Sequence, residues 1–191
     1  MVDTAEITLL LDAARGGDRG ALDSVLATLY QELHGMARRQ LAGQYGHTLD
    51  ATALVHEAYL KLVPGTGLLA RDRIHFFRIA ARAMRQVLVD AARRRATRDR
   101  GNLLLYVEAI AGTAERLSLE VLDLENALVE LEALSPRQAN VVECRFFAGL
   151  SVEETAEALG VSSPTVKREW RIARAWLAQA LGGGPQTRTT G

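Results

Sequence analysis

Apolar residues recur at three- and four-residue intervals along nearly the whole chain, which is the spacing of one buried helix face. In the clearest run, residues 18–41, the apolar positions are Leu22, Val25, Leu26, Leu29, Leu33, Met36 and Ala37. The same spacing predicts helices over residues 8–15, 50–63, 73–95, 123–134 and 135–147. No segment shows the alternation of apolar and polar residues that is typical of strands. The pattern therefore predicts an all-α protein.

Two more helices are predicted over residues 151–181, and they carry the strongest local signals. Ser151 and Glu154 have the spacing of a capping box, in which each side chain binds the backbone N–H of the other residue. Gly160 follows the first of these helices, where a residue in the left-handed conformation can end it sharply. Pro164 lies in the first turn of the second helix, where a missing N–H costs nothing. The segment is therefore predicted to be a helix-turn-helix.

The second of these helices, capped by Ser162 or Ser163, has an apolar face and a basic face. Its inward positions are Val166, Leu177 and either Trp170 or the neighbouring Ala173. The outward positions in its N-terminal half are Thr165, Lys167, Arg168 and Arg171. Two capped helices with a glycine turn also occur in ordinary bundles. The basic face lies at the end that enters the major groove of DNA, however, which favours DNA binding.

Charge is segregated along a chain whose formal net charge is zero. Residues 71–100 contain ten arginines and three aspartates, a local balance of +7. Residues 115–132 contain six acidic residues and one arginine, a local balance of −5. The neutral total therefore hides a basic block and an acidic block.

The longest predicted helix carries most of the basic block. Arg78, Arg82 and Arg85 cluster on the half of its wheel that lies opposite the apolar residues. Stacked arginines repel one another in an isolated helix, which favours a polyanion over solvent as their partner. Arginines near the helix C-terminus also complement the macrodipole, which accounts for part of the charge. Phe76 and Phe77 open the helix and are predicted to lie in the core, with stacking on unpaired bases as the alternative.

The helices group into two small domains joined by a flexible linker, and the second domain contains the helix-turn-helix. We place the first domain at residues 1–98, the linker at 99–119, the second domain at 120–182 and a disordered tail at 183–191. The linker has weak periodicity and scattered glycines, and the tail is rich in glycine and threonine.

Composition disfavours several classes of protein. The four histidines lack metal-ligand spacing, and the chain shows no phosphate-binding glycine loop, so we expect no enzyme, cofactor or metal. The single cysteine, Cys144, lies in an apolar helical stretch and is predicted to be a core residue, which fits a reducing cytoplasm. No apolar run approaches the roughly 20 residues that span a bilayer. The acidic N-terminus is unlike a signal peptide.

Three segments together resemble bacterial sigma factors. Residues 50–62, DATALVHEAYLKL, resemble region 2.2, which docks on the clamp coiled coil of the RNA polymerase β′ subunit. Residues 75–95 resemble regions 2.3 and 2.4, which open and read the −10 promoter element. Residues 134–177 resemble region 4, which reads the −35 element. Their order and spacing are similar to those of the extracytoplasmic-function (ECF) group of the sigma-70 family. The resemblance implies a factor that binds core polymerase and directs promoter-specific transcription initiation.

The resemblance also implies roles for particular residues. The implied polymerase contacts are Asp50, Leu54, Val55, His56, Glu57 and Tyr59. The residues implied along the −10 DNA are Arg78, Arg82, Arg85, Gln86 and Arg93. Those implied at the −35 element are Ser163, Thr165, Lys167, Arg168 and Arg171. Arg168 and Arg171 are the first candidates for base readout, because arginine on guanine is the commonest specific contact. Lys167 fits a phosphate anchor.

The start of the clamp-binding segment departs from the family pattern. In the family it is usually acidic, of the Asp-Ala-Glu-Asp type, whereas here it reads Asp50-Ala51-Thr52-Ala53. On one interpretation, Thr48, Asp50 or Thr52 simply serves as the helix N-cap. On the other, phosphorylation of Thr48 or Thr52 by a Ser/Thr kinase supplies the missing charge, which a helix N-terminus favours.

The implied partners are promoter DNA and core RNA polymerase, contacted at its β′ clamp and β flap, with an anti-sigma factor as a further candidate. We expect a cytoplasmic, nucleoid-associated protein that is monomeric when free. The acidic face around Glu120 to Glu132 is expected to pack against the basic helix when polymerase is absent. The alternative is a helix-turn-helix regulator that acts independently of core polymerase. Whether DNA binding requires polymerase distinguishes the two.

Overall fold

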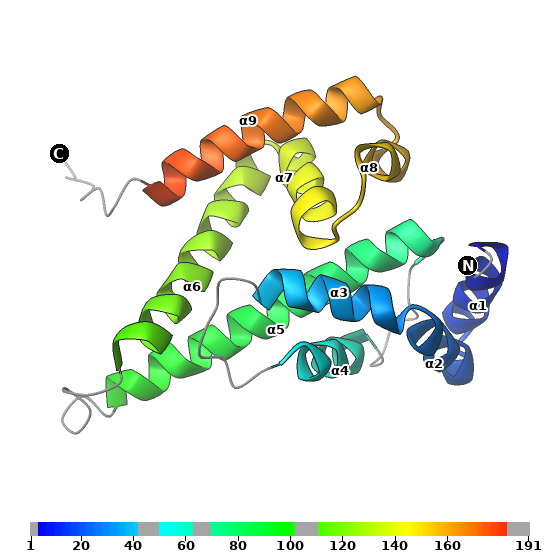
Figure 1. Cartoon of the computed structure of the whole chain (residues 1–191), viewed down its shortest axis with the longest axis horizontal. Coiled ribbons are helices and arrows are strands. Elements are labelled where there is room, and N and C mark those ends of the chain that lie inside the picture. The colour runs from blue at the N-terminus through cyan, green and yellow to red at the C-terminus, as the bar shows by residue number, and fades with distance from the viewer. Residues whose placement is uncertain (1–3, 42–49, 63–69, 102–110, 183–191) are drawn as a thin grey trace.

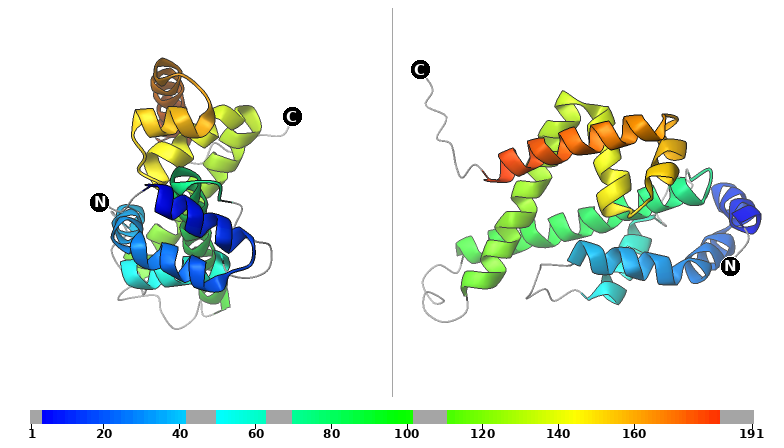
Figure 2. Two further views of the ribbon diagram at one scale, coloured as in Figure 1. Left: turned by 90° about the vertical axis from the view of Figure 1, so that its right-hand side faces the viewer. Right: turned by 45° about the horizontal axis from the view of Figure 1, so that its top comes forward.

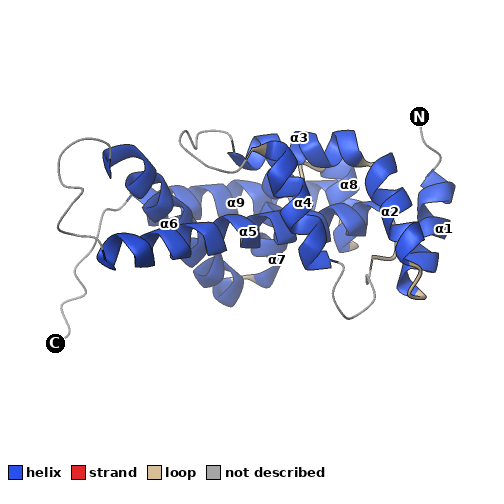
Figure 3. Ribbon diagram, turned by 90° about the horizontal axis from the view of Figure 1, so that it is seen from below, coloured by secondary structure: helices blue, strands red, loops and turns tan. Residues whose placement is uncertain are grey.

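The structure, a computed structural model, describes residues 4–41, 50–62, 70–101 and 111–182. Helices account for nearly all of these residues, and no strand occurs among them (Figure 3). The predicted all-α fold is therefore confirmed for the described part of the chain. The predicted disordered tail, residues 183–191, lies outside it.

The helices form two lobes, one stacked on the other (Figures 1 and 2). The N-terminal lobe consists of α1 (Thr4–Arg15), α2 (Arg19–Thr28), α3 (Tyr30–Leu41), α4 (Ala51–Leu62) and α5 (Arg73–Gly101). The C-terminal lobe consists of α7 (Pro136–Val142), a π-helical turn η1 (Glu143–Phe147), α8 (Val152–Leu159) and α9 (Ser163–Gly182). Between them, α6 (Ala111–Leu134) packs against α5 and also contacts α7 and α9. The long helix α6 therefore bridges the lobes.

Several helix ends are set by local side-chain chemistry. Gly17, with a φ of 95°, makes the turn after α1, and the Asp18 carboxylate then caps α2 by accepting from the Ala21 N–H at 3.1 Å. Ser135 caps α7 by accepting from the Gln138 N–H at 3.4 Å. Ser135 and Gln138 also have the spacing of a capping box, but its second hydrogen bond is absent, because the Ser135 N–H donates to the Leu131 carbonyl at 2.8 Å and the Gln138 amide donates to Glu169.

The predicted helix over residues 18–41 is in fact two helices. The backbone leaves the helical conformation at Leu29, with φ −100° and ψ 12°, and α3 starts at the next residue. Leu29 is itself buried, so the apolar spacing continues through the bend. The sequence pattern therefore could not reveal the break.

The segment predicted as a linker is largely helical at both ends. α5 continues to Gly101 and α6 already begins at Ala111, so only residues 102–110 lie between them, outside the described part. Residues 111–119 include two alanines, two leucines, one glutamate and one arginine, which have high helix propensity even where apolar periodicity is weak. Helices therefore extend into both ends of this segment, and its role as a linker between two domains stays a prediction.

One apolar core extends through both lobes. It includes Met84 of α5 and Leu131 of α6 together with Phe76, Phe77 and Cys144. The two phenylalanines are only 1% and 4% exposed, so the prediction that they lie in the core is confirmed. Cys144 is fully buried as predicted, and burial raises the pKa of its thiol to about 11. Because the core is continuous, the division into two domains stays a prediction.

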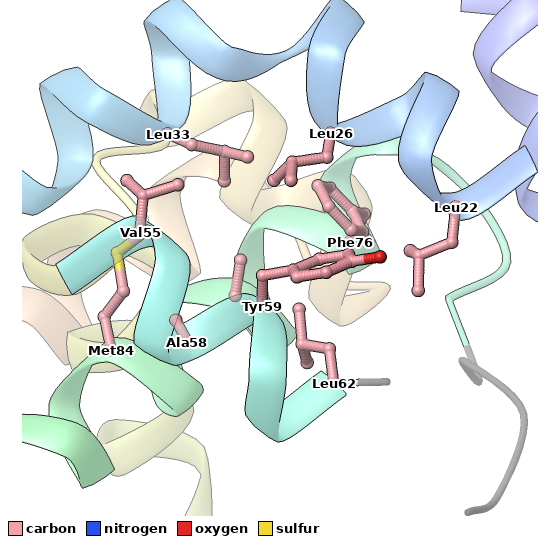
Figure 4. A pocket seen from close by; sticks show the side chains of 10 residues that line it. Leu22, Leu26, Leu33, Val55, Ala58, Tyr59, Leu62, Phe76 and Met84 are labelled. Atoms are coloured by element: carbon pink, nitrogen blue, oxygen red, sulfur yellow. The ribbon is translucent and has the colours of Figure 1, made fainter. Parts of the chain in front are cut away.

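A small apolar gap lies among α2, α3, α4 and α5 (Figure 4). Its volume is about 10 Å³, and its one polar lining side chain, Tyr59, donates its hydroxyl hydrogen to Asp23. A water molecule needs at least this much space and also two or more polar partners. The gap is therefore a packing feature of the core and not a ligand site.

Candidate nucleic-acid interface

The helix-turn-helix forms at α8 and α9 with the predicted caps. The Ser151 hydroxyl accepts from the Glu154 N–H at 3.0 Å, and the Glu154 carboxylate accepts from the Ser151 N–H at 2.8 Å. Gly160 ends α8 in the left-handed conformation, with a φ of 64°. The Ser162 hydroxyl accepts from the Thr165 N–H at 3.4 Å at the start of α9. The capping box, the glycine turn and the serine cap are therefore confirmed.

A small cluster of residues holds the two helices of the motif against α7. Val141 of α7, Ala156 of α8 and Val166 of α9 are buried together. The small side chain of Ala156 leaves room for close helix packing at this point. The inward face of α9 is as predicted, with Val166 and Ala173 fully buried and Trp170 and Leu177 partly buried.

The opposite face of α9 presents the predicted basic residues to solvent. Lys167, Arg168 and Arg171 are exposed, whereas Ser163 and Thr165 are half-buried. All five lie in the first half of α9, which begins at Ser163. The structure therefore brings the predicted −35 residues together at one end of a helix that is anchored by its other face.

Arg168 differs from the other two cations because a neighbouring carboxylate holds it. Its Nε and Nη2 atoms donate to Glu169 Oε1 at 3.3 Å and 2.8 Å. The Gln138 amide of α7 donates to Glu169 Oε2 at 3.1 Å. The bond from Arg168, followed by that from Gln138, lowers the pKa of Glu169. Glu169 is only 8% exposed, and sequence reasoning missed it because an inward glutamate gives no periodic signal.

The predicted −10 residues on α5 fall into two groups. Arg82, Gln86 and Arg93 are exposed. Arg78 and Arg85 are half-buried, and both contact the other lobe. Arg78 donates to the Asn140 side chain of α7 at 3.3 Å. The basic face is therefore only partly available to a ligand in this arrangement.

Arg85 lies where the two lobes meet. Its guanidinium forms ion pairs with Glu125 of α6 and, at 3.2 Å, with Glu143 of η1. It also lies over the Phe147 ring, 5.3 Å from the ring centre. Burial raises the pKa of Glu143, and the nearby Arg85 charge opposes this shift. Among the acidic residues between Glu120 and Glu132, Glu125 thus pairs with the basic helix, and the expected role of this contact when polymerase is absent stays a prediction.

Two residues of α3 add contacts between the lobes that the sequence did not indicate. Arg39 donates to the Ala148 carbonyl at 3.3 Å. The buried Gln40 amide donates to the carbonyls of Ala81, at 3.2 Å, and Phe147, at 3.5 Å. These partners are distant in sequence, so no local pattern could have identified them.

An open groove of about 260 Å³ separates the basic side of α5 from α6 and α7. Arg78, Arg82 and Arg85 lie on one wall, and Glu125 and Glu143 lie on the other. The walls carry opposite charges, so the groove does not have the uniformly basic lining that nucleic acid requires.

The predicted polymerase-binding residues on α4 do not all reach the surface. Asp50 caps this helix by accepting from the Ala53 N–H at 2.7 Å. Of the three N-cap candidates that the sequence left open, Asp50 is therefore the one that caps α4. Thr48 lies outside the described residues. Leu54 and Val55 are 0% and 1% exposed and belong to the core, so the structure does not support a direct surface role for them. They fill the inward face of an amphipathic helix.

The other predicted contacts on α4 lie at or near the surface. His56 and Glu57 are exposed, and Tyr59 is half-buried. The hydrogen bond to Asp23 raises the pKa of the Tyr59 hydroxyl. Thr52, the second candidate for phosphorylation, is exposed in the first turn of α4.

No group of three or more side chains is placed to hold a metal ion within the described part of the chain. No helix there combines the length and apolar character needed to cross a membrane.

Comparison with known proteins identifies the family of this chain. A family model for ECF sigma factors matches residues 4–183. The chain is also similar to the ECF RNA polymerase sigma factor SigM of two Mycobacterium tuberculosis strains, Erdman and H37Rv. Each is 28% identical over 175 residues, which cover 91% of this chain and 83% of the relative. The chain therefore belongs to the ECF sigma factors and directs promoter-specific transcription initiation with core RNA polymerase.

Proposed function

We propose that the two basic helices contact the two promoter elements separately. α9 enters the major groove of the −35 element, where Arg168 and Arg171 read bases and Lys167 holds a phosphate. Ser163 and Thr165 lie at the same end of α9 and contact the adjacent backbone. The exposed basic face of α9 on a fully capped helix-turn-helix is the observation that carries this assignment.

We propose likewise that α5 contacts the −10 element. The residues involved are Arg78, Arg82, Arg85, Gln86 and Arg93. Of these, Arg82, Gln86 and Arg93 are already exposed. Arg85 cannot hold a DNA phosphate while Glu125 and Glu143 occupy its guanidinium. We call the arrangement in which Arg85 pairs with both glutamates the closed arrangement. It is therefore the promoter-free state.

The polar contacts between α5 and the C-terminal lobe are imperfectly satisfied. Four buried side-chain atoms at this interface have no hydrogen-bond partner in the described part of the chain: Gln40 Oε1, Arg78 Nε, Arg85 Nε and Glu143 Oε1. Each such atom costs about 1–3 kcal/mol. Polymerase and DNA can supply new partners for these groups, which favours separation of α6 and the C-terminal lobe from α5.

The exposed side of α4 is the proposed docking surface for the β′ clamp of polymerase. It carries Asp50, His56 and Glu57, with Tyr59 at its edge. Leu54 and Val55 support this surface from the core. The C-terminal lobe is the proposed partner of the β flap. These partners place the protein in the cytoplasm, on the nucleoid, and an anti-sigma factor remains a candidate regulator there.

We also propose that phosphorylation of Thr52 by a Ser/Thr kinase strengthens docking of α4 on the clamp. The Thr52 side chain is exposed in the first turn of α4, where a helix N-terminus favours negative charge. Thr52→Glu is expected to increase polymerase binding and Thr52→Ala to reduce activity in cells, both measured against wild type. Equal cellular activity of Thr52→Ala, together with no gain for Thr52→Glu, would contradict the switch. Thr48, the other candidate, lies outside the described residues.

In vitro transcription from a pooled promoter library tests the proposed function. Purified core polymerase is assayed with and without the protein, alongside a variant that carries Lys167→Ala, Arg168→Ala and Arg171→Ala. Wild type is expected to produce promoter-specific transcripts and the triple variant to lose those that depend on a −35 element. Equal transcript profiles for the two proteins would contradict the role of α9.

A further inference from the structure

We propose that Glu169 is a positioning residue that presets the guanidinium of Arg168 for end-on recognition of a guanine at the −35 element. This inference rests on the proposed entry of α9 into the major groove. It concerns a residue that does not itself face the DNA, because Glu169 is buried on the side of α9 that faces α7.

The geometry of the hydrogen bonds decides which edge of Arg168 is available. Nε and Nη2 of one guanidinium edge both donate to Glu169 Oε1. The planar guanidinium carries five N–H donors in a fixed fork. The edge formed by Nη1 and Nη2 therefore still presents two parallel donors. Two parallel donors match the O6 and N7 acceptors of guanine in the major groove.

Gln138 fixes the position of the Glu169 carboxylate that holds Arg168. Its amide ties Glu169 Oε2 to α7, so the carboxylate is held at both oxygens. α7 in turn packs against α9 through Val141 and Val166. The orientation of Arg168 is thus linked to the body of the C-terminal lobe and not only to its own flexible side chain.

Two physical consequences follow for DNA binding. An arginine that is already oriented loses less side-chain freedom on binding, which is worth about twofold to tenfold in affinity. The carboxylate itself is shielded from DNA phosphates by its burial and by the Arg168 charge. Arg171 has no ion-pair partner among the described residues, so the same preorganisation does not apply to it.

A double-mutant cycle on the −35 base preferences tests the inference. Glu169→Ala, Arg168→Ala and the double variant are compared with wild type by transcription from a library randomised at the −35 element. Glu169→Ala is expected to reduce discrimination about twofold to tenfold at the position that Arg168→Ala affects. The double variant is expected to lose no more than Arg168→Ala alone, because Glu169 acts through Arg168.

Glu169→Gln is the conservative variant, since it keeps the shape of the side chain and the contact with Gln138 but removes the charge that holds Arg168. It is expected to lower discrimination at the same position without lowering the melting temperature. If Glu169→Ala and Glu169→Gln lower the melting temperature but leave the base preference unchanged, the role is structural and the inference is overturned. If Arg168→Ala itself has no effect on base preference, the proposed −35 role of Arg168 fails instead.

Discussion

Replacing Glu125 and Glu143 together by glutamine is expected to open the free protein and strengthen its binding to DNA. Both carboxylates pair with Arg85, and the three side chains are only 14–19% exposed. Removing both charges leaves a largely buried arginine without a counter-ion. This disfavours the closed arrangement by about 3–5 kcal/mol and shifts the equilibrium towards opening by roughly 150- to 5,000-fold.

Small-angle scattering and DNA titration measure this change. The radius of gyration of the double variant is expected to rise. Its affinity for a mixed-sequence duplex is expected to rise as well. The slope of log K against log salt concentration is expected to become more negative by about 0.9 for each added phosphate contact. Glu130→Gln is the matched control, because Glu130 is an exposed glutamate on the same helix.

The single variant Glu125→Gln is a control that distinguishes opening of the interface from a general loss of structure. Glu125 is the more exposed of the two carboxylates, so its replacement is expected to produce a smaller change in the same direction. A double variant with unchanged helicity, radius of gyration and DNA affinity would show that these ion pairs do not hold the lobes together.

Removing Arg171 and removing Lys167 are expected to have different effects on promoter recognition. Arg171→Ala is expected to reduce discrimination at one position of the −35 element by about 1–3 kcal/mol, or roughly 5- to 150-fold, because a bidentate base contact is lost. Lys167→Ala is expected to weaken binding to all sequences alike and to reduce the salt slope by about one, because a phosphate contact is lost. Both side chains are exposed on α9, so neither change is expected to affect folding.

Binding of the polymerase complex to the promoter library, at several salt concentrations, separates these two effects. Arg15→Ala removes an exposed arginine from α1 in the other lobe and serves as the charge-matched control. A uniform loss of affinity for both α9 variants would show that α9 holds the backbone without reading bases.

The features that the sequence predicted correctly are those set by neighbours in the chain. The capping box of Ser151 and Glu154, the turn at Gly160 and the inward position of Val166 all depend on residues within a few positions of one another. Their chemistry is local, so spacing alone indicates it. The burial of Phe76 follows in the same way from its place on the apolar face of α5.

The features that the sequence missed depend on tertiary contacts. Glu143 pairs with Arg85 only when the lobes meet, and the Gln40 amide donates to Ala81 of α5 and to Phe147 of the other lobe, so neither has a partner nearby in sequence. The family resemblance implied Leu54 and Val55 as polymerase contacts, and amphipathic packing of α4 buries both. The resemblance implies which helix to propose for docking on polymerase, whereas packing decides which of its side chains are exposed.

The most direct test of the separate roles of α5 and α9 is one transcription experiment on a promoter library randomised at both elements. Core polymerase is supplied with wild type, with Arg82→Ala on α5 or with Arg171→Ala on α9, both of which replace exposed arginines. We expect Arg82→Ala to weaken dependence on the −10 element alone and Arg171→Ala to weaken base preference at the −35 element alone. Identical profiles for the two variants, or a change at the opposite element, would contradict the assignment of the two helices.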